Sequence, residues 1–134
     1  MRTHRPQRIA GTLLLPIALL AGCDGIATVC TSEFAVVTVT VVDTLGAPVT
    51  DATVTSTLLR TGAILSPTSL ALLTAGTYII VDDGAREPLR NAGDSVGVTA
   101  RRGTGPSLPA TYVIDVPGGC HVHKLSGPDT LSLP

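Results

Sequence analysis

The strongest structural signal in this chain is the segment FAVVTVTVVD, which spans residues 34–43. Apolar and polar side chains alternate along it with a period of two residues, and valine and threonine both favour extended backbone. Successive side chains of a strand point to opposite faces of its sheet. One face is apolar and carries Ala35, Val37, Val39 and Val41. Thr38 and Thr40 lie on the other face, so we expect a strand with its valines in the core and these threonines more exposed.

Further segments have strand character and are separated by turn signals such as Asp43 to Pro48: 49–57, 76–82, 95–101, 110–116, 120–125 and 130–133. Val54, Val98 and Ile114 are expected on their inner faces. About seven short strands without a helix of three turns predict an all-β domain, an antiparallel β-sandwich. Residues 58–75 fit either short strands or one irregular helical turn, and Pro67 argues against a long helix there.

The first residues have the pattern of a bacterial export signal. Arg2, Arg5 and Arg8 precede an apolar run, residues 9–20, that is too short to cross a membrane, which takes about 20 residues. The run ends in Leu-Ala-Gly-Cys at residues 20–23, which resembles the lipobox of bacterial lipoproteins. That resemblance implies cleavage before Cys23 and attachment of a diacylglycerol to its sulfur. The alternatives are an ordinary cleaved signal peptide and an uncleaved anchor.

These patterns divide the chain into a signal peptide at residues 1–22, a lipidated tether at residues 23–33 and a β-sandwich at residues 34–134. The expected location is the bacterial envelope, with the acylated Cys23 in membrane lipid. Asp24 resembles an inner-membrane retention signal of some bacteria, but that rule varies between phyla. The choice between the cell membrane and the outer membrane therefore stays open.

Charge and aromatic content argue against a nucleic-acid partner. Cleavage before Cys23 would remove three of the nine basic residues and none of the ten acidic ones, leaving a net charge of about −4. The chain has two tyrosines, one phenylalanine and no tryptophan. It therefore lacks both the basic face and the stacking platform that nucleic acids require.

Two cysteines, Cys30 and Cys120, remain once Cys23 is lipidated. Disulfides persist outside the cytoplasm, and an even pair in an exported domain favours a disulfide over two unpaired buried thiols. Closing a loop of about 90 residues would remove about 4–5 kcal/mol of unfolded-state entropy. We therefore predict a Cys30–Cys120 disulfide that compensates for a core with little aromatic bulk.

Three motifs resemble a known domain family: VTVVDTLGAPVTDATV at residues 39–54, AGTY at 75–78 and GDSVGVTA at 93–100. Together they look like a carboxypeptidase regulatory-like domain, a transthyretin-like, seven-stranded sandwich with an Ig-like architecture. The resemblance covers most of residues 35–133 and implies a non-catalytic accessory, a folding aid or a binding module. Its motifs form turns and strands and contain no catalytic residue, so they indicate a fold more than an activity.

Two groups of side chains are candidate ligand sites. His121 and His123 flank Val122 on a predicted strand, where both imidazoles would lie on one face about 6.5–7 Å apart. They could bind zinc or copper if a third ligand converged; otherwise they occupy a solvated strand face. The acidic residues of the loop after residue 80 could bind Ca²⁺, but interleaved arginines favour a solvated loop with local ion pairs: Asp82, Asp83, Glu87 and Asp94.

The sequence contains none of the short motifs of hydrolases, zinc proteases or phosphate-binding loops. It also lacks the Tyr-Arg-Gly-Ser motif of the hydroxyisourate hydrolases among the transthyretin relatives. We therefore expect a non-enzymatic envelope lipoprotein without a cofactor, whose sandwich is a binding or structural module for a protein or glycan of the envelope. The alternative is a metal- or small-ligand-binding lipoprotein that uses His121 and His123. A hydrolase is the weakest of the three hypotheses.

Overall fold

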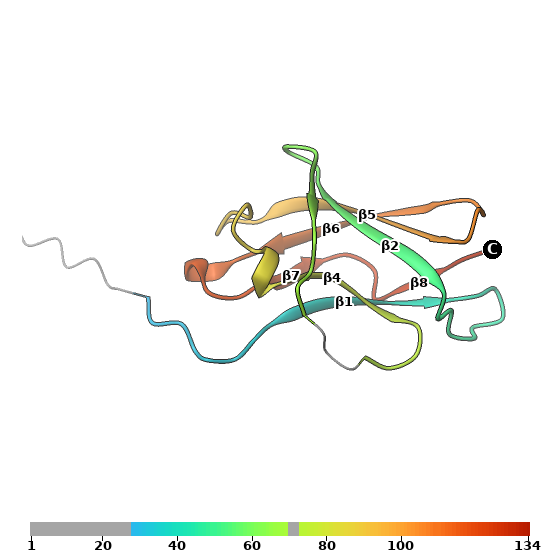
Figure 1. Cartoon of the computed structure of the whole chain (residues 1–134). Coiled ribbons are helices and arrows are strands. Elements are labelled where there is room, and N and C mark those ends of the chain that lie inside the picture. The colour runs from blue at the N-terminus through green and yellow to red at the C-terminus, as the bar shows by residue number, and fades with distance from the viewer. Residues whose placement is uncertain (1–27, 70–72) are drawn as a thin grey trace, which may run out of the picture.

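The computed structural model describes residues 28–69 and 73–134 (Figure 1). The predicted signal peptide and Cys23 lie outside the described residues. The described chain forms eight strands and two single-turn 3₁₀ helices. The strands are β1 (Val36–Val42), β2 (Ala52–Leu58), β3 (Ala63–Leu65), β4 (Thr77–Asp82), β5 (Asp94–Arg102), β6 (Leu108–Asp115), β7 (His123–Ser126) and β8 (Thr130–Ser132). The 3₁₀ turns are η1 (Asp83–Ala85) and η2 (Pro117–Gly119). No helix among the described residues is long and apolar enough to span a bilayer.

The strands form two sheets that pack face to face, which confirms the predicted β-sandwich. One sheet has the order β4-β1-β8 and the other has the order β3-β2-β5-β6-β7 (Figure 1). All pairs of strands are antiparallel except β1 with β8, which pair in parallel through Thr40 to Val42. β7 belongs to the larger sheet and β8 to the smaller one, so the chain changes sheets between them.

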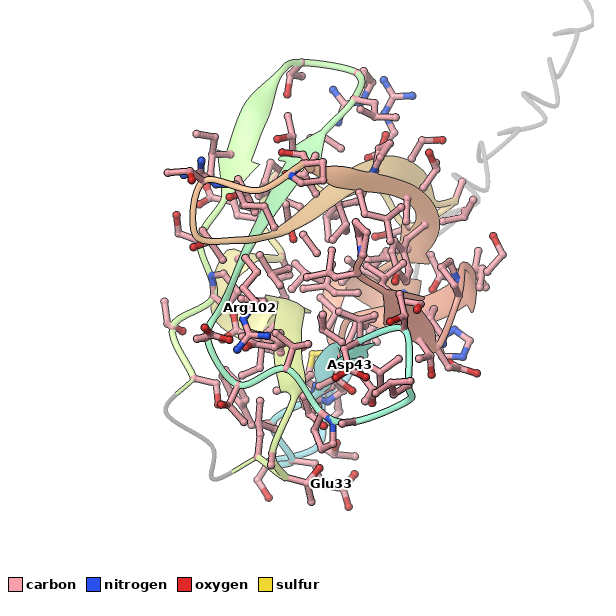
Figure 2. All side chains as sticks on the ribbon, turned by 90° about the vertical axis from the view of Figure 1, so that its right-hand side faces the viewer. Glu33, Asp43 and Arg102 are labelled. Atoms are coloured by element: carbon pink, nitrogen blue, oxygen red, sulfur yellow. A yellow bond between two sulfur atoms is a disulfide. The ribbon has the colours of Figure 1, made fainter. Side chains whose placement is uncertain are left out.

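The first strand has the predicted register. Val37, Val39 and Val41 are 5%, 1% and 0% exposed, and Thr38 and Thr40 on the opposite face are half-buried. The three valines belong to the hydrophobic core. Side chains of the two sheets fill the space between them (Figure 2). The turn after β1 is closed by Asp43, whose Oδ1 accepts hydrogen bonds from the N–H groups of Leu45 and Ala47.

The remaining core predictions are confirmed with one exception. Val98 and Ile114 are fully buried, but Val54 is only half-buried. On the inner face of β2, Ala52 and Val54 are half-buried, whereas Ser56 and Leu58 are buried. Leu108, near Val54 across the larger sheet, is likewise only partly covered.

One segment differs from the sequence expectation, and a second segment, whose structure the sequence left open, contains a short strand. The strand expected at residues 120–125 begins only at His123, because η2 places Cys120 in helical backbone with φ −90° and ψ −64°. In the open segment 58–75, residues 63–65 form the short strand β3, which makes a hairpin with the end of β2. Residues 70–72 of that segment lie outside the described part of the chain.

Candidate functional site

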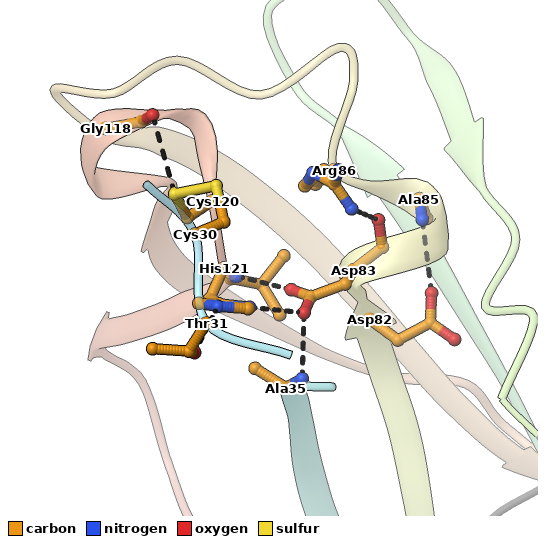
Figure 3. A network of polar contacts seen from close by, with 11 residues as sticks. Cys30, Thr31, Ala35, Asp82, Asp83, Ala85, Arg86, Gly118, Cys120 and His121 are labelled. Atoms are coloured by element: carbon orange, nitrogen blue, oxygen red, sulfur yellow. Dashed lines mark hydrogen bonds and ion pairs between the residues drawn. A yellow bond between two sulfur atoms is a disulfide. The ribbon is translucent and has the colours of Figure 1, made fainter. Parts of the chain in front are cut away.

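A disulfide joins the tether to the sandwich at the end where β1 begins. Cys30 and Cys120 have a Cα–Cα distance of 5.3 Å, within the range of about 4.4–6.8 Å expected for a bridged pair, so the predicted disulfide is confirmed. Cys30 precedes β1, and Cys120 follows η2 (Figure 3). The bridge therefore fixes the segment before the first strand to the segment before β7.

The carboxylate of Asp83 lies beside this disulfide and collects hydrogen bonds from two other parts of the chain. Its side chain is 3% exposed and belongs to η1, directly after β4. Oδ2 accepts the N–H of Ala35 at 2.8 Å and contacts Nδ1 of His121 at 2.7 Å. Oδ1 accepts the N–H of Val122 at 2.8 Å. One carboxylate therefore connects the start of β1, the end of β4 and the approach to β7.

These contacts determine the ionisation state of Asp83. Burial alone would raise its pKa, but the N–H groups of Ala35 and Val122 and the imidazole of His121 lower it, and the net pKa lies below the ordinary value for aspartate. At neutral pH Asp83 is therefore an anion that only accepts hydrogen bonds. Nδ1 of His121 must carry the hydrogen that points at it.

The other ring nitrogen of His121 contacts the tether. Nε2 lies 3.0 Å from Oγ1 of Thr31, the residue after Cys30. Because Nδ1 is the donor to Asp83, Nε2 of the neutral ring has a free lone pair and accepts the hydroxyl hydrogen of Thr31. A hydroxyl, an imidazole and a buried carboxylate thus form a continuous chain of hydrogen bonds (Figure 3). We call these residues together with the disulfide the tether clamp: Cys30, Thr31, Ala35, Asp83, Cys120 and His121.

The second histidine contacts a different carboxylate. Nδ1 of His123 lies 3.2 Å from Oδ1 of Asp115, and its side chain is 64% exposed. His121 precedes β7 and is not on the same strand as His123, so the expectation of two imidazoles on one strand is wrong. In the part of the chain that the structure describes, no three His, Cys, Asp or Glu side chains lie close enough to hold a metal ion. A metal site at His121 and His123 stays a prediction.

The acidic residues expected in a solvated loop are mostly buried, which corrects that expectation. Asp82, Asp83 and Asp94 are 0%, 3% and 6% exposed, while Glu87 is exposed. Asp82 accepts the N–H of Thr68 at 2.7 Å and that of Ala85 at 3.1 Å. These carboxylates are buried because they replace water at backbone N–H groups that no strand partner satisfies.

A cleft of about 590 Å³ opens next to Asp83. Arg86, Glu87 and Asn91 supply polar groups to its lining, and Leu89 and Val116 supply apolar ones. The atom Nη1 of Arg86 donates to the backbone carbonyl of Asp83 at 2.7 Å, so its guanidinium is held at the edge of the clamp. Ligand sites usually combine an apolar lining with a few polar groups, and this cleft contains groups of both kinds.

His121, Asp83 and both cysteines could be identified as candidates from the sequence, but Thr31 could not. No local pattern marks Thr31, since it lies 90 residues from His121 in the sequence. Its neighbour Cys30 is the available signal: once Cys30 and Cys120 are paired, the residues that follow them must also lie close together. Comparison of the chain with protein-family models, with curated proteins and with solved structures finds no match.

Proposed function

We propose that this protein is an exported lipoprotein, held in a bacterial membrane by acylated Cys23, and that its sandwich is a binding or structural module of the envelope. The tether clamp is the observation that carries the proposal. A disulfide at Cys30 supports a location outside the cytoplasm, where such bonds persist. The lipobox-like residues 20–23 come only a few residues before Cys30 in the sequence.

The clamp has the properties that a membrane attachment requires. Three successive ties hold the tether: the disulfide at Cys30, the hydroxyl of Thr31 on His121, and the N–H of Ala35 on Asp83. A force applied at Cys23 would therefore reach the body of the sandwich through a covalent bond before it reached β1. The first strand would keep its register under such a load.

The carboxypeptidase regulatory-like resemblance supports the second half of the proposal. Members of that family usually serve as accessory or binding modules, and the described domain has the sandwich architecture that the resemblance implies. The cleft beside Asp83 is the surface that we propose for an envelope partner, a protein or a glycan, because it joins Arg86, Glu87 and Asn91 in one concave area.

Metabolic labelling with a clickable fatty acid tests the anchor. The wild-type protein should be labelled, and its mature form should begin at Cys23. The Cys23→Ser variant should lose the label and keep residues 1–22, because the sulfur that accepts the lipid is gone. The Cys30→Ala/Cys120→Ala double variant is the matched control and should retain the label. An unlabelled wild-type protein would overturn the proposal.

A further inference from the structure

The tether clamp contains the three kinds of group that hydrolases use to activate a hydroxyl. Thr31, His121 and Asp83 follow one another as hydroxyl, imidazole and buried carboxylate, with distances of 3.0 Å and 2.7 Å between the contacting atoms. We propose that Thr31 is a nucleophile for acyl transfer, with His121 as its general base, and that the site accepts carboxylic esters. This activity goes beyond the proposed function and does not depend on it.

The direction of the hydrogen bonds favours this assignment. Asp83 is ionised and can only accept, so it fixes the tautomer of His121 with the hydrogen on Nδ1. Nε2 then faces Oγ1 of Thr31 as an acceptor, the polarity that a base needs to remove the hydroxyl proton. The N–H groups of Ala35 and Val122 hold Asp83 from two sides, so the carboxylate cannot turn away from the ring.

The burial of the three groups also fits their roles. Asp83 is 3% exposed, the side chain of His121 is 27% exposed, and Thr31 is exposed at the surface. A substrate can therefore reach the hydroxyl while the orienting carboxylate stays shielded from water. Ser32, the next residue, is exposed, and its N–H donates to no acceptor within the described residues. The N–H after the nucleophile is one that such sites use to stabilise the oxyanion.

The reaction balances without a cofactor. Oγ1 of Thr31 attacks the ester carbonyl carbon, and its proton moves to Nε2 of His121. The bond to the alkoxy group breaks, and His121 returns the proton to the departing alkoxide, which leaves as an alcohol. Water then attacks the acyl-Thr31 ester, with His121 again taking and returning a proton, and a carboxylic acid is released. Asp83 stabilises the imidazolium in both halves and acts as a positioning residue.

This proposal departs from the expectation that the domain is not an enzyme. That expectation rested on the absence of short sequence motifs, and such motifs detect only nucleophiles in known local contexts. An arrangement of this kind is recognised by geometry and not by sequence position. Here the hydroxyl and the base are 90 residues apart, and the fold and the disulfide bring them together.

The molecule supplies a matched control in its other histidine–aspartate pair. His123 contacts Asp115 through Nδ1 at 3.2 Å, as His121 contacts Asp83. Within the described residues, however, no hydroxyl contacts Nε2 of His123. The two pairs thus share one interaction and differ in the presence of a nucleophile. A variant of His123 removes an imidazole without disturbing Thr31.

The test uses the full-length exported protein in mild detergent, with its disulfide verified by intact mass. A fluorophosphonate probe should modify the wild type, and peptide mapping should place the adduct on Thr31. Thr31→Ser should still be labelled, whereas Thr31→Val should not. His121→Gln should slow labelling and p-nitrophenyl acetate hydrolysis about 100-fold or more, as loss of a general base does. His123→Gln should leave both rates unchanged.

Three outcomes would overturn the proposal: an unlabelled wild type, an adduct on a residue other than Thr31, or equal rates in His121→Gln and His123→Gln. The variants of Thr31 change one exposed side chain, and circular dichroism with the disulfide mass shows whether each remains folded. The fatty-acid label reports on Cys23 and the fluorophosphonate on Thr31. Failure of one proposal is therefore distinguishable from failure of the other.

Discussion

Tyr112 is one of the few aromatic residues of this chain, and its side chain lies in the core. It is fully buried on β6, and its hydroxyl donates to the carbonyl of Pro128 at 2.9 Å. The ring lies so close to Gly127 that a Cβ there would come within 2.3 Å of it, and Gly127 also has φ +126°. Glycine at this position lets the connection from β7 to β8 cross directly over the ring.

The environment of Tyr112 predicts a loss of stability at alkaline pH. Burial, with a smaller contribution from the negative charge of Asp129, raises the pKa of Tyr112 to about 12. Because an unfolded tyrosine ionises near pH 10, the unfolded state releases this proton first, and its free energy falls relative to that of the folded state as the pH rises. The contribution of Tyr112 to the free energy of unfolding should therefore be constant below about pH 10 and fall between about pH 10 and 12.

Urea unfolding at a series of pH values, read beside the tyrosinate absorbance, checks this expectation. Tyr112→Phe should lower stability at neutral pH by about 1 kcal/mol, through loss of the hydrogen bond to Pro128, and should remove this part of the alkaline decline. A tyrosine signal that titrates completely near pH 10 in the folded protein would contradict the assignment.

At the scale of elements, the start of β5 is tied to the turn after β2 by Asp94. Its carboxylate accepts Nε of Arg60 at 3.0 Å and the N–H of Arg90 at 3.0 Å, and its side chain is 5% exposed. The hydrogen bond from Arg60 is the main cause that lowers the pKa of Asp94, although burial opposes it. The ion pair therefore connects a hairpin turn, a loop and a strand.

Removal of this carboxylate should be costly. Asp94→Ala should lower the free energy of unfolding by about 2–3 kcal/mol, because the guanidinium of Arg60 and the N–H of Arg90 both lose a charged acceptor. The variant should also be less acid-sensitive: a carboxylate with a lowered folded pKa stabilises above its unfolded pKa, and that stabilisation disappears as the pH falls through the folded value.

The exposed pair Asp51–Arg102 is the control for this change. Its contacting atoms lie 2.8 Å apart, but both side chains are more than half exposed. Asp51→Ala should change stability by less than about 1 kcal/mol, as is usual for surface ion pairs. Equal losses in the two variants, measured by urea unfolding, would show that burial does not distinguish these pairs.

The strands could be predicted where the alternation of apolar and polar side chains within one segment was enough to identify them. The faces of β1 follow from a period of two, which holds whatever the partner strands are. Val54 was predicted to be buried and is half-buried, because a period of two fixes the face on which a side chain lies but not how fully that face is covered. Asp82 and Asp94 were expected in solvent, because nothing near them in the sequence reveals the N–H groups that they accept. Thr31 was missed for the same reason.

At the scale of the whole molecule, the Cys30–Cys120 bond encloses six of the eight described strands, β1 to β6. Its sequence separation is 90 residues, so the crosslink should remove about 4–5 kcal/mol of unfolded-state entropy. The Cys30→Ala/Cys120→Ala variant should therefore lose about 4 kcal/mol of stability, less any relief of strain. Urea unfolding of the oxidised wild type and this variant measures the difference. A loss below about 1 kcal/mol would mean that the bond fixes the tether without stabilising the fold.

The parallel pairing of β1 with β8 has a consequence for the time at which this protein can fold. β1 is made early in the chain, but the strand on one of its sides, β8, lies almost 90 residues later, at Thr130–Ser132. Pairings between distant segments form slowly, because the intervening chain must be ordered first. If the chain crosses a membrane from its N-terminus, β1 emerges with both edges uncovered, and the edge that pairs with β8 stays so until the last strand arrives. In that case we expect the smaller sheet to close after translocation, with the valine-rich first strand as the segment that a chaperone on the far side of the membrane would need to shield in the interval.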